Sequence, residues 1–159
     1  MSDLLQALYG GDRVRVEELL TADPELDVFE AAAFGRTDRL RELLDDDPSR
    51  ANQFGADGFH PLGLACFFGH VEAARLLLDR GAEVNTLSKN DHIQTAAIHA
   101  AAAAQGTGEA TRYELVKLAL EHGADPNLAQ GGGSRAIDAA RQNGDAHVEQ
   151  LLLEHGSTE

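Results

Sequence analysis

The chain of 159 residues has no tryptophan, one cysteine and one methionine, and only 5% of its residues are aromatic. A lone cysteine, Cys66, excludes an internal disulfide and suits a reducing compartment, so we expect a cytoplasmic protein. Residues 1–5 have neither a basic start nor a long apolar run, which predicts no signal peptide and no membrane association. Secretion by a route that reads other signals stays open.

Basic residues are scarce as well. Thirteen Lys and Arg stand against 27 Asp and Glu, for a net charge of −14. Such a surface repels the phosphate backbone of DNA and RNA, so we expect no nucleic acid partner. A basic protein partner would instead be attracted during encounter. Arginine far exceeds lysine among the basic residues, which is typical of GC-rich bacterial genomes.

The chain also has none of the motifs that carry enzyme chemistry. Its seven histidines form no His-x-x-x-His or Cys/His set, and no Gly-x-Ser-x-Gly motif is present. The glycines at 131–133 lack the Gly-Lys-Ser/Thr ending of a phosphate-binding loop. Cys66 follows Leu64 and Ala65, where a buried residue is expected. We therefore expect no catalytic residue, no cofactor and no metal.

What the sequence does have is internal repetition. Residues 81–85 (GAEVN) return as residues 123–127 (GADPN), and the leucines at 76–78 return at 151–153. Single glycines mark the same point in successive units, each after an Ala-rich apolar stretch: Gly11, Gly35, Gly69 and Gly144. Self-similarity on this scale predicts a stacked repeat array.

The clearest unit spans residues 60–82 and predicts a helical hairpin. Pro61 suits the first turn of a helix, where its missing N–H group costs nothing. Gly69 and Gly81 can take the left-handed conformation that ends a helix. The apolar residues of both helices cannot all be covered within one hairpin, so neighbouring hairpins must cover them.

This pattern resembles the ankyrin repeat, whose hallmark is a Thr-Pro-Leu-His-x-Ala-Ala helix, then Gly-His, a Leu-Leu-Leu helix and Gly-Ala-Asp-Val-Asn. The resemblance implies an all-α solenoid of about five helix-turn-helix repeats with short β-turn fingers, forming one domain over residues 1–159. The approximate units are 4–24 as an N-terminal cap, 25–52, 53–85, 86–127 with insertions, and 128–156 as a C-terminal cap.

Three departures from the repeat pattern carry predictions. In the third unit His60 replaces the usual Thr and Gly63 the usual His, so we expect that unit to lose hydrogen bonds and to be looser. The first junction is about ten residues short and lacks a finger. The fourth unit is lengthened before Ala96 and again around residues 106–111. Insertions in such arrays often serve binding, but tolerated length drift explains them equally well.

The resemblance also indicates a binding face. In ankyrin repeats, the two residues before the inner-helix glycine and the finger residues face a concave groove, and five of the six phenylalanines fall within residues 34–68. Clustered aromatics with a polar rim are typical of binding hot spots, although they can equally fill the space between helices and fingers. The predicted partner-binding residues are Phe34, Arg36, Ala56, Asp57, Phe59, Phe67, Phe68, Arg80, His92, Ile93 and Thr95.

The function that the resemblance implies is a non-enzymatic protein-binding module: an adaptor, regulator or inhibitor that holds a protein partner in its groove. We expect a monomer, with a homodimer left open. Two alternatives remain at this point. The array could bind a small ligand or regulate an enzyme as its subunit, with the unit-four insertions closing a pocket, or it could act as a secreted effector.

Overall fold

The computed structural model describes residues 1–158, and their only regular elements are helices. The helices are α1 (Asp3–Tyr9), α2 (Arg13–Thr21), α3 (Val28–Ala33), α4 (Thr37–Asp46), the 3-10 helix η1 (Pro48–Asn52), α5 (Pro61–Phe67), α6 (Val71–Asp79), α7 (Ala97–Ala102), α8 (Glu109–Glu121), α9 (Ala136–Asn143) and α10 (Ala146–Glu154). The predicted all-α solenoid is confirmed.

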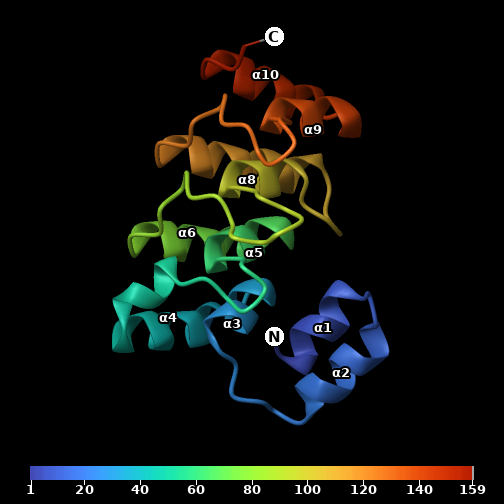
Figure 1. Ribbon diagram of the computed structural model, residues 1–159, viewed down its shortest axis with the longest axis vertical. Coiled ribbons are helices and arrows are strands. Elements are labelled where there is room, and N and C mark those ends of the chain that lie inside the picture. The colour runs from blue at the N-terminus through green and yellow to red at the C-terminus, as the bar shows by residue number, and fades with distance from the viewer. Residues whose placement is uncertain (159) are drawn as a thin grey trace.

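Four helical hairpins, from α3–α4 to α9–α10, stack like rungs along the long axis of the molecule (Figure 1). The inner helices α3, α5, α7 and α9 pack on one another in order, and the outer helices α4, α6, α8 and α10 form a second row. Alanine recurs at one position of every inner helix and is fully buried there: Ala32, Ala65, Ala101 and Ala140. Larger side chains at these positions would force the inner helices apart.

A glycine with positive φ closes the inner helices of the stack as the sequence predicts. Gly69 follows α5 with φ of 80°, and Gly35 follows α3 with φ of 64°. A side chain would be strained in this conformation, and at Gly35 it would also collide with the ring of His70. The turns into α4 and α6 therefore require glycine.

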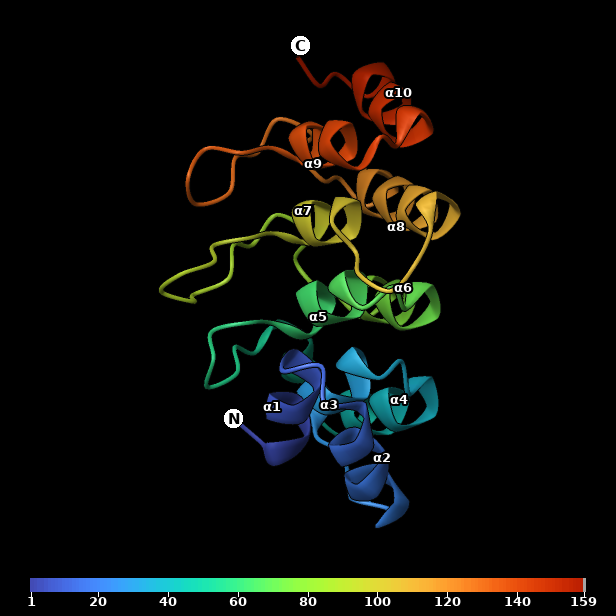
Figure 2. The ribbon, with the colours of Figure 1, turned by 90° about the vertical axis from the view of Figure 1, so that its right-hand side faces the viewer.

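Fingers project from one side of the stack, between each outer helix and the next inner helix (Figure 2). The Gly55 N–H donates to the Phe59 carbonyl at 2.8 Å, and the Lys89 N–H donates to the Gly58 carbonyl of the preceding finger, also at 2.8 Å. A Cβ at Gly58 would lie 2.5 Å from the backbone of Lys89. Neighbouring fingers are thus joined by backbone hydrogen bonds that only glycine at this position permits.

An asparagine at the base of each finger joins its unit to the next. The side-chain amide of Asn52 donates to the Gly81 carbonyl at 3.0 Å and accepts from the Glu83 N–H at 2.9 Å. Asn85 makes the same pair of bonds with Gly123 and Asp125. The repeated segments 81–85 and 123–127 therefore carry a regular link between units.

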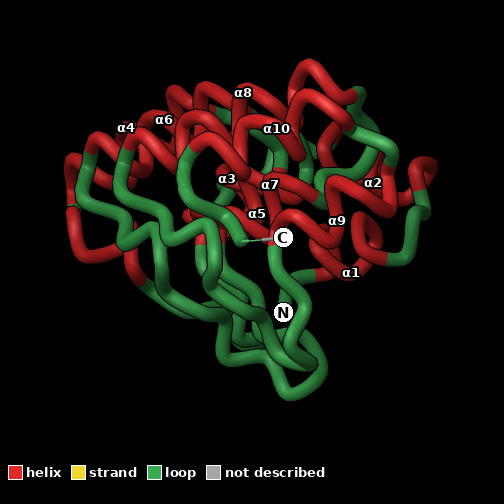
Figure 3. Tube along the Cα trace, turned by 90° about the horizontal axis from the view of Figure 1, so that it is seen from above, coloured by secondary structure: helices red, strands yellow, loops and turns green. Residues whose placement is uncertain are grey.

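The α1–α2 hairpin is not part of the row of four stacked hairpins. A six-residue linker without a finger, residues 22–27, connects it to α3, as predicted for the first junction. The hairpin then lies beside α3 on the inner, finger-bearing side (Figures 1 and 3) and does not continue the rungs. We expected residues 4–24 to cap the end of the stack. In this position α1 buries Leu4 and Leu5, whereas α2 has no fully buried side chain and packs on the core only through the partly buried Val16, Leu19 and Leu20.

The expected loosening of the third unit is wrong. His60 precedes α5, where its Nδ1 accepts the Gly63 N–H at 3.1 Å and its Nε2 meets the Thr86 carbonyl at 3.1 Å. In the fourth unit His99, three residues further along its repeat, binds the equivalent Leu128 carbonyl. The imidazole has moved within the repeat, and the absence of a side chain at Gly63 leaves room for its ring.

Candidate functional site

A cavity of about 500 Å³ opens on the concave side between the N-terminal hairpin, α5 and the finger of the fourth unit. Its walls are mainly apolar, and we call it the aromatic groove after the rings that define it: Tyr9, Phe59, Phe67 and Phe68. Phe68 follows α5 and forms an edge-to-face pair with Phe67, with ring centroids 5.1 Å apart. The far wall includes Ile93, which is 52% exposed.

Tyr9 enters this groove from the end of α1. Its ring stacks on Phe68 with centroids 6.2 Å apart and meets Phe59 edge-on at 6.3 Å. Its hydroxyl donates to Asp57 Oδ2 at 2.9 Å. Burial, and then this hydrogen bond, raise the pKa of Tyr9 above its usual 10.0, so the hydroxyl stays protonated at neutral pH.

The structure brings five of the eleven predicted site residues together in the groove: Phe59, Phe67, Phe68, Ile93 and Thr95. Asp57 joins them through its bond to Tyr9. Ala56, Asp57 and His92 line a separate polar hollow of about 350 Å³ between the finger tips. Phe34 is half-buried against the core, which is the packing role that we weighed against binding.

Two predicted residues of the polar rim do not reach the groove. Arg80 lies at the end of α6, where its guanidinium pairs with Asp45 at 2.5 Å between the outer helices α4 and α6. Its placement on the rim was wrong, because the turn after the outer helix directs the side chain toward the preceding outer helix. Arg36, at the start of α4, lines a different cavity.

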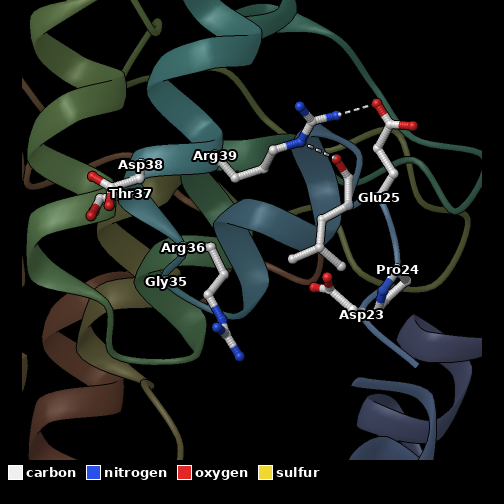
Figure 4. Close-up of a pocket in the computed structure, with 9 residues that line it drawn as sticks. Asp23, Pro24, Glu25, Gly35, Arg36, Thr37, Asp38 and Arg39 are labelled. Atoms are coloured by element: carbon white, nitrogen blue, oxygen red, sulfur yellow. Dashed lines mark hydrogen bonds and ion pairs between the residues drawn. The ribbon is translucent and has the colours of Figure 1, made fainter. Parts of the chain in front are cut away.

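That cavity, of about 580 Å³, separates the linker to the N-terminal hairpin from the start of α4 (Figure 4). Arg39 closes one side, since its Nε donates to the Leu26 carbonyl at 2.9 Å and its Nη2 to Glu25 at 3.2 Å. Arg36 extends in another direction in Figure 4, into the space that Asp23 also borders. Its lining has no aromatic ring and is mostly polar or charged, with Pro24 and Leu26 as the apolar residues.

The first insertion of the fourth unit and the residue before the second one line the aromatic groove. The first insertion supplies Ser88 and Ile93, and Gln105 precedes the second and donates its N–H to the Phe67 carbonyl at 2.8 Å. Arg112 fixes the second insertion: it donates to the Thr107 carbonyl at 2.7 Å and pairs with Asp145 through two bonds. The first insertion and Gln105 therefore build one wall of the groove.

The comparisons with known proteins agree with this architecture. The profile of ankyrin repeats in three copies matches residues 4–88 and 28–130. The chain belongs to the ankyrin repeat family. It is 30% identical over 127 residues to ankyrin repeat and SAM domain-containing protein 6 of Rattus norvegicus, covering 80% of this chain and 13% of that protein. It is 31% identical over 120 residues to the putative ankyrin repeat protein YahD of Escherichia coli (strain K12), covering 74% of this chain and 57% of that one.

These relatives are longer than the region that they share with this chain. An E3 ubiquitin-protein ligase of Caenorhabditis elegans, hecd-1, is 33% identical over 87 residues, which is 55% of this chain and 3% of the ligase. Ankyrin repeats generally mediate protein–protein interactions, and the region that this chain matches is a small part of such a relative. Within residues 1–158, each helix is too short or too polar to span a lipid bilayer.

Cys66, His122 and His155 are either buried in the ankyrin repeat stack or bound to its backbone. Cys66 is 2% exposed, and burial raises the pKa of its thiol to about 12, as suits the core position predicted for it. His122 and His155 each contact the carbonyl four residues earlier at the end of an outer helix. Among the described residues no cluster of three or more His, Cys, Asp or Glu is arranged to hold a metal.

Three histidines make the ankyrin repeat stack sensitive to acid. Burial lowers the pKa of His60, His70 and His99 below the usual 6.5. A lowered folded-state pKa gives stability that is present above the unfolded pKa and is lost as pH falls through the folded pKa. We expect the free energy of unfolding to be constant near pH 7.5 and to fall below pH 6.5, by at most about 1.4 kcal/mol per pH unit for each histidine still neutral.

Urea unfolding at a series of pH values measures this dependence. The exposed His92 serves as the control, because His92→Asn should leave the profile below pH 6.5 unchanged. His99→Gln should reduce the slope, because it removes one of the three titrating groups. A wild-type profile that stays flat down to pH 5 would contradict the assignment.

Sequence reasoning missed Tyr9, although the signal was present. Residues 9–11 read Tyr-Gly-Gly, and Gly11 is the inner-helix glycine of the first unit. The rule that placed Phe67 and Phe68 in the groove, as the two residues before that glycine, places Tyr9 there too.

Proposed function

We propose that this ankyrin repeat chain is a non-enzymatic module that binds a protein partner through the aromatic groove. The observation that carries the proposal concerns exposed apolar side chains. Five large hydrophobic residues are exposed in the described chain, and three of them line this one cavity: Tyr9, Phe67 and Ile93. Apolar groups gathered at one exposed site typically mark an interaction surface.

The surroundings of the groove support the same function. The fingers are joined by backbone hydrogen bonds, and the inner helices are packed through buried alanines, so the binding face is preformed. A preformed surface loses little conformational entropy on binding. The net charge of −14 favours a basic partner, chiefly by accelerating encounter. A buried, unreactive thiol at Cys66 is compatible with the cytoplasm, and we propose a monomeric state.

Replacing Phe67 with serine tests the groove. Phe67 is 37% exposed, so Phe67→Ser should leave helicity unchanged while lowering partner affinity tenfold or more, roughly the effect of truncating an aromatic hot spot. The matched control is Val14→Ser, because Val14 is 69% exposed and lies on α2 outside the groove. Proteins captured from lysate by the three immobilised chains are identified by mass spectrometry, and the affinity of any candidate is then measured by titration with purified proteins.

A partner bound equally by wild type, Phe67→Ser and Val14→Ser would contradict the proposed site. The size of the cavity, about 500 Å³ with mainly apolar walls, favours a small apolar ligand as the second candidate. If no protein is captured, and a small apolar compound raises the melting temperature of wild type but not of Phe67→Ser, this second function replaces the first.

A further inference from the structure

We propose that the α1–α2 hairpin is a displaceable occupant of the aromatic groove, and that Tyr9 holds the position taken by a tyrosine of the partner. The partner segment would be a short helix that presents this tyrosine, as α1 does. This inference rests on the proposed function for its partner. The occupancy itself rests on contacts within this chain.

The contacts of Tyr9 resemble those of a bound ligand. Its ring has an aromatic face below it in Phe68 and an aromatic edge beside it in Phe59, and its hydroxyl reaches Asp57. These groups belong to the third unit, 48 residues or more further along the chain. A tyrosine is thus recognised at both its apolar and its polar end, whereas phenylalanine would leave Asp57 without this donor.

The rest of the hairpin is weakly attached. Its second helix, α2, has no fully buried side chain, only the partly buried Val16, Leu19 and Leu20, and it does not pack closely on α4 as each later outer helix packs on the one before it. Residues 22–27 connect it to α3 without the finger bonds that join the other units. Within this linker Asp23 has φ of 50°, which is unusual for a residue other than glycine. The hairpin is therefore held by the buried Leu4 and Leu5, by Tyr9, and by four partly buried apolar side chains: Leu8, Val16, Leu19 and Leu20.

The open part of the groove lies next to Tyr9. Phe67 and Ile93 remain exposed although Tyr9 is in place, so the occupant covers only part of the apolar surface. A partner segment that supplied its own tyrosine, replaced the contacts of Leu4 and Leu5, and also covered Phe67 and Ile93 would bury apolar area that the hairpin leaves exposed. The hydrophobic effect then favours exchange of the hairpin for the partner.

A synthetic peptide of residues 1–21, labelled with fluorescein, tests the occupancy without a known partner. The receiving protein is the full chain with Leu5→Asp and Tyr9→Ala, which releases the hairpin and leaves the part of the groove that α5, Phe59 and the finger of the fourth unit form. We expect saturable binding by fluorescence anisotropy, and binding to wild type at least tenfold weaker, because the tethered hairpin competes at high effective concentration.

Variants of the peptide and of the groove test which contacts of Tyr9 are needed for binding. A peptide with Tyr9→Phe should bind about fivefold more weakly through loss of one hydrogen bond, and a peptide with Tyr9→Ala should not bind measurably. Adding Phe68→Ala to the receiving protein should abolish binding. Equal binding of the unaltered and the Tyr9→Ala peptides, or no binding to a receiving protein that retains its helicity, overturns the proposal.

Hydrogen exchange on the wild-type chain gives a second measurement that needs no folded variant. Amides of α1 and α2 should exchange at least a hundredfold faster than those of α5 and α7, because the hairpin opens independently of the stack. Equal protection of α1 and α5 would contradict displacement.

The outcomes for the proposed function and for this inference are separable. A partner that is lost with Phe67→Ser, but is bound equally by wild type and by the Leu5→Asp/Tyr9→Ala chain, supports the groove and rejects displacement. Peptide binding in the expected order, with no partner whose binding depends on Phe67, supports the occupancy and rejects the proposed function.

Discussion

Arg112→Ala should destabilise the protein by about 3 kcal/mol, the lower end of the cost of breaking a buried ion pair. Asp145 is almost fully buried before α10, and its carboxylate accepts from Arg112 Nε at 2.5 Å and from Nη2 at 2.9 Å. No helix-capping bond to the Asp145 side chain replaces these contacts. The variant leaves a buried carboxylate without its cation. Urea unfolding followed by circular dichroism measures the loss.

The matched control for this variant is Arg75→Ala. Arg75 lies 3.8 Å from Glu72 on the surface of α6, with 45% and 76% of the two side chains exposed, so its loss should change stability by less than about 0.5 kcal/mol. The double variant Arg112→Ala/Asp145→Ala should be more stable than Arg112→Ala alone, because it removes the unpaired charge. If Arg112→Ala costs no more than the control, the ion pair does not fix the unit-four insertion.

His60→Ala should destabilise the protein by about 2–3 kcal/mol, because two hydrogen bonds of a buried side chain are lost together. His60 is 5% exposed and joins the start of α5 to the Thr86 carbonyl of the following finger. Without the imidazole this carbonyl and the Gly63 N–H lose their partners. The midpoint of urea unfolding should fall, with the slope unchanged, since the surface exposed on unfolding is nearly the same.

The double variant His60→Thr/Gly63→His tests whether the imidazole can make the same contacts from the other repeat position. Gly63→His alone should destabilise, since its Cβ would lie 3.1 Å from the ring of His60. The double variant restores the arrangement of the fourth unit, where His99 lies in the first turn of α7 and binds the Leu128 carbonyl at 2.6 Å. We expect it to recover most of the stability lost in His60→Ala. A double variant less stable than both single variants would show that the two arrangements are not equivalent.

Much of the stack could be predicted because each unit repeats its own local signals. Gly35 and Gly69 mark turns with positive φ, and Pro61 starts a helix. Cys66 was placed in the core from its apolar neighbours. These signals act within a few residues of the chain, so a single sequence displays them. The exchange of roles between His60 and Gly63 is nearly as local. Each of the two departures, taken alone, predicts a lost hydrogen bond, and only the two positions together indicate that His60 replaces the missing imidazole.

The groove was predicted only in part because its composition depends on contacts between distant segments. Helical periodicity indicates that residues 3–21 are helical, but it does not indicate which surface they cover. Tyr9 meets Phe59 and Phe68 through the placement of a whole hairpin. The pairing of Arg80 with Asp45 likewise depends on how two outer helices align. The division into five units within one domain, and the partner-binding residues, stay predictions.

The order in which the ribosome makes these elements has a consequence for the N-terminal hairpin. Residues 1–21 emerge before the third unit, because Asp57, Phe59 and Phe68, which contact Tyr9, are synthesised 48 or more residues after it. The apolar side chains of Leu4, Leu5 and Tyr9 therefore lack native contacts while the third unit is translated. The hairpin is thus made before the surface on which it docks, and during that interval it is free to contact a nascent-chain chaperone or a neighbouring polypeptide.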